Sequence, residues 1–155
     1  MDLKQVTLCL LTKDDNVLLA MKKRGWGQGK WNGVGGKLNS GETVEEAAIR
    51  ETQEEINVVP EKLKQVATIN FYFPKSPDWN QQMCVYLITR WQGEPKESEE
   101  MRPKWFPKNK IPLEEMWEAD THWMPQVLAG KLLKADFIYN NDQQLEEFEI
   151  KEGSF

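Results

Sequence analysis

Apolar and polar positions divide the beginning of the chain into two runs of β-strand character. Residues 5–12 and 17–21 are rich in β-branched and large apolar side chains, which is a composition typical of strands. Between them lie the polar residues 13–16, of the kind that form tight turns. We therefore expect these two runs to pair as a β-hairpin.

A glycine-rich segment and then a helical segment follow. Residues 22–36 contain six glycines, too many for a helix, so we expect a long shaped loop. Residues 43–56 give the clearest helical signal in the chain, because Thr43 and Glu46 stand three apart as a capping box. Asn57 can adopt the left-handed conformation that ends a helix.

The second half of the chain returns to strand patterns and adds one more helix. That helix is expected from Asp120 to Ala129, with Gly130 ending it and Pro125 disturbing its first turns. Strands are expected at 65–73, 82–91, 104–106, 134–139 and 145–150, with a turn at 140–142 between the last two. The order of elements predicts a single domain, residues 1–155, of the α+β or α/β class, in which helices cover a mixed sheet.

Composition restricts the classes of function. Twenty-five acidic against 20 basic side chains give a net charge of −5, which repels a phosphate backbone and disfavours binding of long nucleic acid. Apolar runs are far shorter than the roughly 20 residues of a membrane span, and the N-terminus lacks the pattern of a secretion signal. A soluble, cytoplasmic monomer is the simplest expectation. Cys9 and Cys84 lie in apolar runs and are expected to be buried, reduced thiols.

The first expected helix carries acidic residues along its apolar stripe. Positions three and four apart share a helix face, so Glu51 and Glu55 continue the stripe that begins with Val44, and Glu54 lies three residues beyond Glu51. Clustered anions near a helix C-terminus oppose the helix dipole and need a cation. Carboxylate oxygens suit Mg²⁺ or Mn²⁺. The alternative is a salt-bridged surface cluster neutralised by Arg50.

Residues 36–58 resemble the Nudix box. In that motif a glycine is followed at fixed spacing by a glutamate, an Arg-Glu pair, a Glu-Glu pair and an aliphatic residue. The matching positions are Gly36, Glu42, Arg50, Glu51, Glu54, Glu55 and Val58. Thr52 and Asn57 depart from the motif, but threonine keeps one branch methyl and asparagine tolerates a positive φ.

The resemblance extends over nearly the whole chain, to the oxidised purine nucleoside triphosphatases of the MutT-homologue type. The further matching segments are 21–25, 31–33, 100–103, 105–106, 111–112 and 116–117, with Asp120 and Trp123. It implies the Nudix fold, an α/β/α sandwich, and hydrolysis of a small nucleotide such as 8-oxo-dGTP to the monophosphate and pyrophosphate. The implied role is sanitation of the nucleotide pool.

The same resemblance assigns roles to individual residues. For the metal ion, Mg²⁺ or possible Mn²⁺, it implies the Gly36 carbonyl with Glu51 and Glu55 as ligands, Glu54 as a ligand or its support, and Glu100 from another loop. These four glutamates form the catalytic group, in which Glu51, Glu54 or Glu100 takes the proton of the attacking water. The implied substrate-binding residues are Thr7, Lys22, Trp26, Asn32, Phe71, Trp117 and Asp120.

The substrate residues have distinct expected roles. Trp117 would stack on the base, Asn32 would contact it, and Asp120 would read the purine edge. The alternative for Trp117 is a core tryptophan beside Trp123, and the alternative for Lys22 is a solvated lysine without a phosphate contact.

Two departures from the resemblance bear on substrate choice. Ala119 stands where the group usually has a second aspartate beside Asp120, and Gln81 stands in place of a methionine. Without a like-charged neighbour, Asp120 is expected to stay ionised at neutral pH and to favour guanine-type over adenine-type edges. Other nucleoside triphosphates and dinucleoside polyphosphates stay open as substrates. A non-catalytic module is disfavoured because all the metal carboxylates are present.

Overall fold

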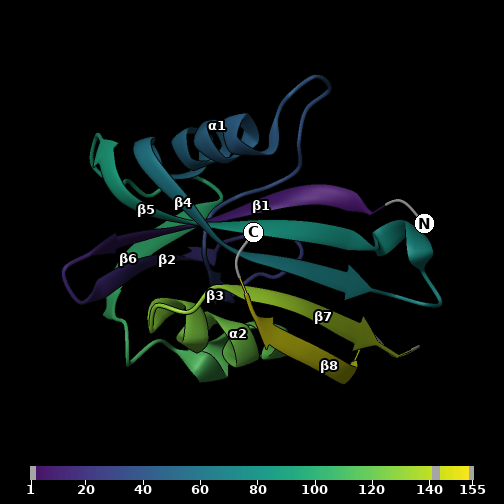
Figure 1. Ribbon diagram of the computed structural model, residues 1–155. Helices are drawn as coiled ribbons and strands as arrows, with labels where there is room; N and C mark the ends of the chain where they lie inside the picture. Colours follow the sequence, from purple (N-terminus) through teal and green to yellow (C-terminus); the bar gives the residue numbers. More distant parts are fainter. Residues whose placement is uncertain (1–2, 141–143, 154–155) are drawn as a thin grey trace.

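The computed structural model describes residues 3–140 and 144–153, which form a sheet flanked by helices (Figure 1). The strands are β1 (Lys4–Lys13), β2 (Asn16–Lys22), β3 (Trp31–Asn32), β4 (Val59–Tyr72), β5 (Gln81–Gln92), β6 (Met101–Pro107), β7 (Leu133–Tyr139) and β8 (Leu145–Glu152). The helices are α1 (Val44–Ile56) and α2 (Glu118–Leu128), with the short 3₁₀ turns η1 (Pro77–Trp79) and η2 (Leu113–Glu115).

The sheet is mixed, with the strand order β3-β2-β1-β5-β4-β7-β8, and β6 also pairs with β2. β1 is parallel to β5 and β4 is parallel to β7, whereas the other described strand pairs are antiparallel. The first expected hairpin is confirmed, since Leu11 of β1 faces Leu18 of β2. The pairing of β7 with β8 is also confirmed, while most of the expected turn at 140–142 lies outside the described residues.

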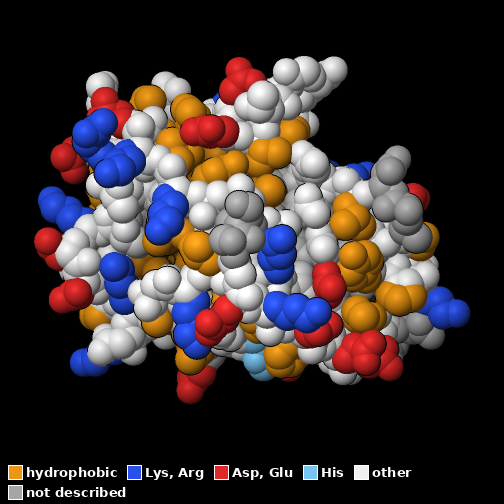
Figure 2. All heavy atoms as spheres, in the orientation of Figure 1, with side chains coloured by type: hydrophobic (Ala, Val, Ile, Leu, Met, Phe, Trp, Pro, Cys, Tyr) orange, Lys and Arg blue, Asp and Glu red, His pale blue; other side chains and the backbone are white. Residues whose placement is uncertain are grey.

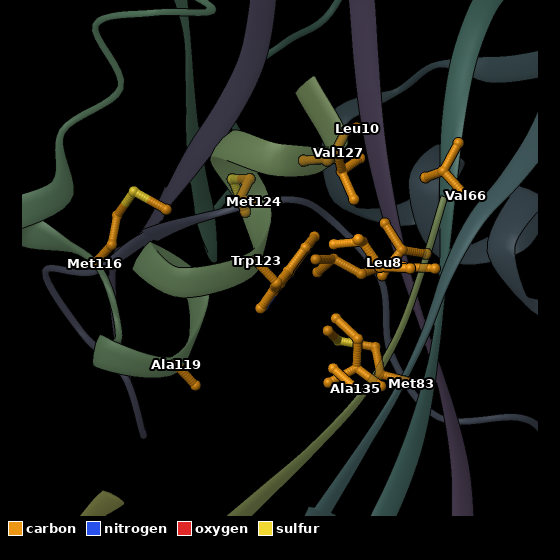
Figure 3. Packing of buried hydrophobic residues seen from close by; sticks show 14 of the residues in the cluster. Leu8, Leu10, Val66, Met83, Met116, Ala119, Trp123, Met124, Val127 and Ala135 are labelled. Carbon is orange, nitrogen blue, oxygen red and sulfur yellow. The ribbon is translucent and has the colours of Figure 1, made fainter. Parts of the chain in front are cut away.

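Alternation along β1 divides its side chains between the two helices, because successive residues of a strand point to opposite faces. Leu8 and Leu10 pack in the cluster that contains Trp123 of α2 (Figure 3). Cys9 packs in the second cluster, which contains Ala48 of α1. Figure 1 shows α1 on one side of the sheet and α2 on the other. The expected α/β/α sandwich with a mixed sheet is confirmed.

Helix α1 begins and ends as its sequence predicts. The Thr43 hydroxyl accepts a hydrogen bond from the Glu46 amide at 3.1 Å, and the Glu46 carboxylate accepts one from the Thr43 amide at 2.9 Å. Asn57 ends the helix with a φ of 64°. Thr52 is fully buried and donates its hydroxyl to the Ala48 carbonyl at 2.8 Å. This departure from the Nudix box therefore leaves no unsatisfied hydroxyl in the core.

The prediction of a strand at 65–73 was wrong at its start, and the prediction of a loop over 22–36 missed a short strand. β4 begins at Val59 rather than at residue 65, because register shifts against β5 between Pro60 and Ala67 break the alternation that would reveal a strand. β3 lies inside the expected loop 22–36 and owes its conformation to its pairing with β2. Tertiary pairing, which local composition does not report, sets both limits.

The later elements are also longer than predicted. β6 extends beyond 104–106 because all of its residues pair with β2. α2 begins at Glu118 rather than at Asp120, and Pro125 lies in its second half, so the first turns are undisturbed. Over the described residues, neither helix combines the length and the apolar character that a membrane crossing requires.

Both cysteines are buried and free, as expected. The Cys9 residue is 1% exposed, and its sulfur lies 3.8 Å from the Ala48 carbonyl oxygen of α1. Burial raises the pKa of the Cys9 thiol to about 12, and it also raises the pKa of Cys84. Cys9 is therefore part of the packed contact between β1 and α1.

Candidate functional site

Two glycines bring the end of the long loop against β1 and α1. An added Cβ at Gly35 would lie 1.9 Å from the Thr7 carbonyl oxygen, and one at Gly36 would lie 2.6 Å from the carboxylate carbon of Glu51. A side chain at either position would displace these neighbours. The Thr7 amide donates to the Gly36 carbonyl at 2.9 Å. The glycines therefore hold Glu51 directly beside the backbone of the loop.

Arg50 ties three carboxylates of the Nudix box together. Its guanidinium donates to Glu42 at 2.6 and 3.0 Å. It also donates to Glu51 at 2.9 Å and to Glu54 at 3.1 Å. Hydrogen bonds to Glu42 and then to Glu51 raise the pKa of Arg50, and the bond from Arg50 lowers the pKa of Glu42. The salt-bridged cluster considered as the alternative is therefore present, and it includes two of the expected metal ligands.

Glu55 is a partly buried acid on the α1 side of the sheet. It accepts a hydrogen bond from the Gly35 amide at 3.2 Å. Burial raises the pKa of Glu55 to about 8, and the charge of Glu51 adds to this rise. The Gly35 amide and the charge of Lys22 oppose it, while Glu100 raises it further. Acids crowded in this way are stabilised by a bound cation.

The loop that carries Glu100 is fixed by the residue that follows β2. The Lys23 amide donates to the Glu100 carbonyl at 2.8 Å, and the Lys23 ammonium pairs with Glu97 and donates to the Ser98 carbonyl at 2.9 Å. A hollow of about 280 Å³ results, lined by Arg24, Glu51, Glu54, Glu55, Ser98, Glu99 and Glu100. The structure thus brings together the four glutamates that were expected to act as one group.

The donor chemistry of this hollow fits a divalent cation, because carboxylates and a backbone carbonyl are ligands that Mg²⁺ and Mn²⁺ prefer. Within residues 3–140 and 144–153, no group of three or more carboxylate, histidine or cysteine side chains is already close enough together to hold a metal ion. Arg50 holds Glu51 and Glu54 instead. The Gly36 carbonyl uses one lone pair for the Thr7 amide and keeps another. Arg50 bonds to one oxygen of Glu51 and one of Glu54, so the second oxygen of each carboxylate stays open to a cation.

At the start of α2, Trp117 stacks on Trp26 of the glycine-rich loop. The ring centroids are 4.5 Å apart and the ring planes differ by 19°. The Lys30 ammonium lies 5.5 Å from the centroid of the Trp117 ring. Trp123 is fully buried, whereas Trp117 is half-buried. Trp123 is therefore the core tryptophan, and Trp117 presents a ring at the surface of the α2 side.

Asp120 is the buried acid on the α2 side. Its Oδ1 accepts a hydrogen bond from Trp123 Nε1 at 3.0 Å, and its Oδ2 is buried without a hydrogen-bond partner in the described part of the chain. Burial raises the pKa of Asp120 to about 7, against the opposing effect of the Trp123 bond. The expectation that Asp120 stays fully ionised at neutral pH is therefore wrong. Removal from water raises its pKa even though Ala119 supplies no like charge.

Thr7 and Lys22 lie on the side of the carboxylates. The Thr7 hydroxyl is 3.4 Å from both the amide nitrogen and the carbonyl oxygen of Gly36. The charge of Lys22 reaches Glu55, where it lowers the pKa. Thr7 thus contacts the Gly36 backbone, while the Lys22 side chain lies between Glu55 and Gly27, whose added Cβ would also be 3.4 Å from the Trp117 ring.

Phe71 and Asn32 occupy other parts of the sheet. Phe71 belongs to the α2-side cluster, and its ring centroid is 6.4 Å from that of Tyr139. Asn32 lies on β3, where its Oδ1 accepts a hydrogen bond from the next backbone amide at 2.8 Å. Burial raises the pKa of Tyr139, and the charge of Asp120 contributes to this rise. Tyr139 therefore shares the electrostatic environment of Asp120.

Sequence reasoning missed Arg24 and Tyr139 as site residues. Arg24 belongs to the run 21–25 that carries part of the family resemblance, and the acidic run at 97–100 was the signal that could have indicated its partner. Tyr139 comes from β7, and it reaches the neighbourhood of Asp120 through tertiary structure.

Known proteins resemble this chain in sequence over almost its full length. The NUDIX domain matches residues 2–127. The chain is 40% identical over 149 residues to the oxidized purine nucleoside triphosphate hydrolase of Danio rerio, which covers 96% of this chain and 95% of that protein. It is 38% identical over 146 residues to the protein of the same name from Mus musculus, covering 94% and 93% of the two chains.

A solved structure shares the fold as well. The crystal structure of the MutT protein from Bacillus halodurans matches with a TM-score of 0.82 and 27% identity, over 96% of this chain and 98% of that one. The Nudix fold expected from the box is therefore confirmed. Box, fold and sequence similarity agree, and the chain belongs to the Nudix family.

Proposed function

We propose that this chain hydrolyses oxidised purine nucleoside triphosphates such as 8-oxo-dGTP to the monophosphate and pyrophosphate, and so clears them from the nucleotide pool. The observation that carries the proposal is the convergence of Glu51, Glu54, Glu55 and Glu100 on one hollow. The relatives from Danio rerio and Mus musculus, both named oxidized purine nucleoside triphosphate hydrolases, support the substrate class.

Nudix hydrolases generally need a divalent metal ion, and we propose Mg²⁺ for this chain, with Mn²⁺ as a substitute. Glu51, Glu55 and the Gly36 carbonyl would hold the ion, and Glu54 and Glu100 would bind or support it. When bound, the ion offsets the repulsion between a triphosphate and the carboxylates and withdraws charge from phosphorus.

The residues of the chain position the remaining reactants. One of Glu51, Glu54 or Glu100 takes the proton of the water that attacks the β-phosphorus. Asp120 offers the unpartnered Oδ2 to a purine edge, and Trp117 offers a flat ring. The proposed substrate-binding residues are Thr7, Lys22, Trp26, Asn32, Phe71, Trp117 and Asp120.

We propose that the whole chain, residues 1–155, acts as one domain, as a monomer in the cytoplasm. A small-molecule substrate fits its surface better than long nucleic acid does. Figure 2 shows acidic and basic side chains interspersed on the face in view, without one continuous basic area. The net charge of −5 also disfavours binding of long nucleic acid.

A kinetic panel with product identification tests the proposal. 8-oxo-dGTP should show a higher kcat/KM than dGTP, ATP or a dinucleoside polyphosphate, and ¹⁸O from labelled water should appear in pyrophosphate. A higher kcat/KM for an unmodified substrate would contradict the substrate class. Label in the monophosphate would mean attack at the α-phosphorus instead.

A further inference from the structure

Arg24 and Arg50 both carry positive charge at the carboxylate hollow, but they are held differently. Arg50 makes hydrogen bonds of 2.6 to 3.1 Å to three glutamates, and its side chain is 24% exposed. Arg24 lies 3.5 Å from Glu99 and 3.6 Å from Glu100, longer than a usual hydrogen bond, and its side chain is 61% exposed. Arg50 is a fixed counter-charge, whereas Arg24 is loosely held.

The main chain on both sides of Arg24 nevertheless has a defined conformation. On one side, the Lys23 amide donates to the Glu100 carbonyl at 2.8 Å. On the other side, Gly25 has a φ of 78°, and no atom lies within 4 Å of the position that its Cβ would take. Gly25 therefore supplies a left-handed backbone conformation directly after Arg24. The backbone delivers the guanidinium to the hollow, while its weak contacts can be exchanged.

The charges of the hollow indicate which kind of ligand Arg24 can bind. Five of its lining residues are glutamates, and Arg24 is the basic residue among them. A cation that engages Glu100 would compete with Arg24 for that carboxylate. The guanidinium would then keep only the exposed Glu99 of these two partners, when a polyphosphate brings new anionic oxygens into the same space.

We propose that Arg24 is a phosphate-binding residue, which exchanges the Glu100 carboxylate for phosphate oxygens of the substrate and then holds the pyrophosphate product. This role rests on the proposed hydrolysis of a triphosphate at the same hollow. A guanidinium suits the role because its planar donors bind two phosphate oxygens in a fixed bidentate geometry, whereas an ammonium group acts as a flexible point charge.

Calorimetric titration of pyrophosphate into the intact protein with Mg²⁺ tests the role of Arg24. Arg24→Gln should weaken pyrophosphate binding about 10-fold and raise KM for the triphosphate by a similar factor, with kcat changed less than about 3-fold. Arg24→Lys should recover part of the affinity. Arg90→Gln is the matched control, because Arg90 is 70% exposed and lies 3.6 Å from Glu61 outside the hollow. Unchanged pyrophosphate affinity in Arg24→Gln would overturn the proposal.

A second titration separates phosphate binding from a role in holding Glu100. Loss of the arginine frees the Glu100 carboxylate, so Arg24→Gln should bind Mn²⁺ without nucleotide as tightly as the wild type, or more tightly. Weaker Mn²⁺ binding would show that Arg24 positions Glu100, and it would also overturn the proposal. If Arg24→Gln weakens pyrophosphate binding as expected but the wild type hydrolyses no nucleoside triphosphate, the proposed function fails while the phosphate contact stands.

Discussion

On the α1 face of the sheet, Glu51 and Glu54 share the guanidinium of Arg50, whereas on the α2 face Asp120 lies among apolar side chains. Within the described residues, the Oδ2 atom of Asp120 has no hydrogen-bond partner. Pairing with opposite charge stabilises the carboxylates of the first face. On the second face, removal from water controls the protonation of Asp120.

A comparison of Glu55 with Asp120 shows how the electrostatic environments of the two faces differ. Glu55 is partly buried, whereas Asp120 is buried, and burial together with neighbouring acids raises the pKa of Glu55 to about 8. A surplus of anions is useful where a cation will be bound. A single buried acid near neutrality, by contrast, can present either a donor or an acceptor to a neutral ring. Under the proposed function, the α1 face would bind the phosphates and the α2 face would bind the base.

The strongest test of the α1 face is Glu51→Gln or Glu55→Gln. Each change removes a charged ligand while it keeps the shape of the side chain, so kcat should fall at least about 100-fold with the fold intact. Steady-state kinetics with circular dichroism measures both. Glu45→Gln is the control, because Glu45 is an exposed acid of the same helix. Near-normal turnover in either site variant would contradict the metal assignment.

Because Asp120 is buried on the α2 face, it should make the free energy of unfolding depend on pH. The pKa of Asp120 is raised from 3.8 to about 7, so the folded state binds this proton more tightly than the unfolded state. Its contribution to the free energy of unfolding is largest below about pH 4 and falls as the pH rises to about 7. Between pH 5 and pH 8, the wild type should lose on the order of 2 kcal/mol more than Asp120→Asn.

Urea unfolding of both proteins at the two pH values measures this difference. Glu55 also has a raised pKa, but it is common to both proteins, so its contribution cancels. Equal losses in wild type and variant would mean that water reaches Asp120, and the contrast between the faces would disappear.

Substrate choice should depend on pH through the same residue. Ionised Asp120 accepts hydrogen bonds from a guanine-type edge, whereas protonated Asp120 donates to the ring nitrogen of an adenine-type edge. The ratio of kcat/KM for 8-oxo-dGTP over 2-hydroxy-dATP should therefore rise by up to about 100-fold from pH 6 to pH 8, because the ratio of ionised to protonated Asp120 changes by that factor. Tyr139 keeps its proton in this range because its pKa is raised. A constant ratio in the wild type, equal to that of Asp120→Asn, would exclude Asp120 as the switch.

The smallest expected effect concerns the start of α1. Thr43→Ala removes one half of the capping box and should lower the free energy of unfolding by about 1 kcal/mol. Activity under stabilising conditions should change little, because Gly35 and Gly36 still hold Glu51 against the loop. Denaturant unfolding and kcat measure the two effects. A large loss of kcat would show that the cap, and not the glycine contact, positions the carboxylates.

The α1 face could be predicted from the sequence because its information is local. Glu51, Glu54 and Glu55 follow from the period of a helix, and the Thr43 cap follows from the chemistry of the adjacent residues. The hairpin of β1 and β2 was also predictable, since two apolar runs flank a polar turn.

The remaining features depend on contacts between distant segments. Arg24 meets Glu100 because two loops are joined by backbone hydrogen bonds, and β4 extends to Val59 through bulged pairing with β5. The protonation of Asp120 depends on how completely α2 and the sheet exclude water. Thr7 lies beside Gly36 because of the register between β1 and the end of the glycine-rich loop. The spacing of residues in the sequence does not specify that register.

Oxidants of the kind that damage purines also attack ionised thiols, and the thiolate is the reactive form. With a pKa of about 12, Cys9 has roughly one thiol in 10⁵ ionised at pH 7. Its sulfur lies against the Ala48 carbonyl, so added oxygens would push α1 away from β1 and carry Glu51 with it. Burial of Cys9 thus protects the geometry of the site in the conditions that produce its proposed substrate.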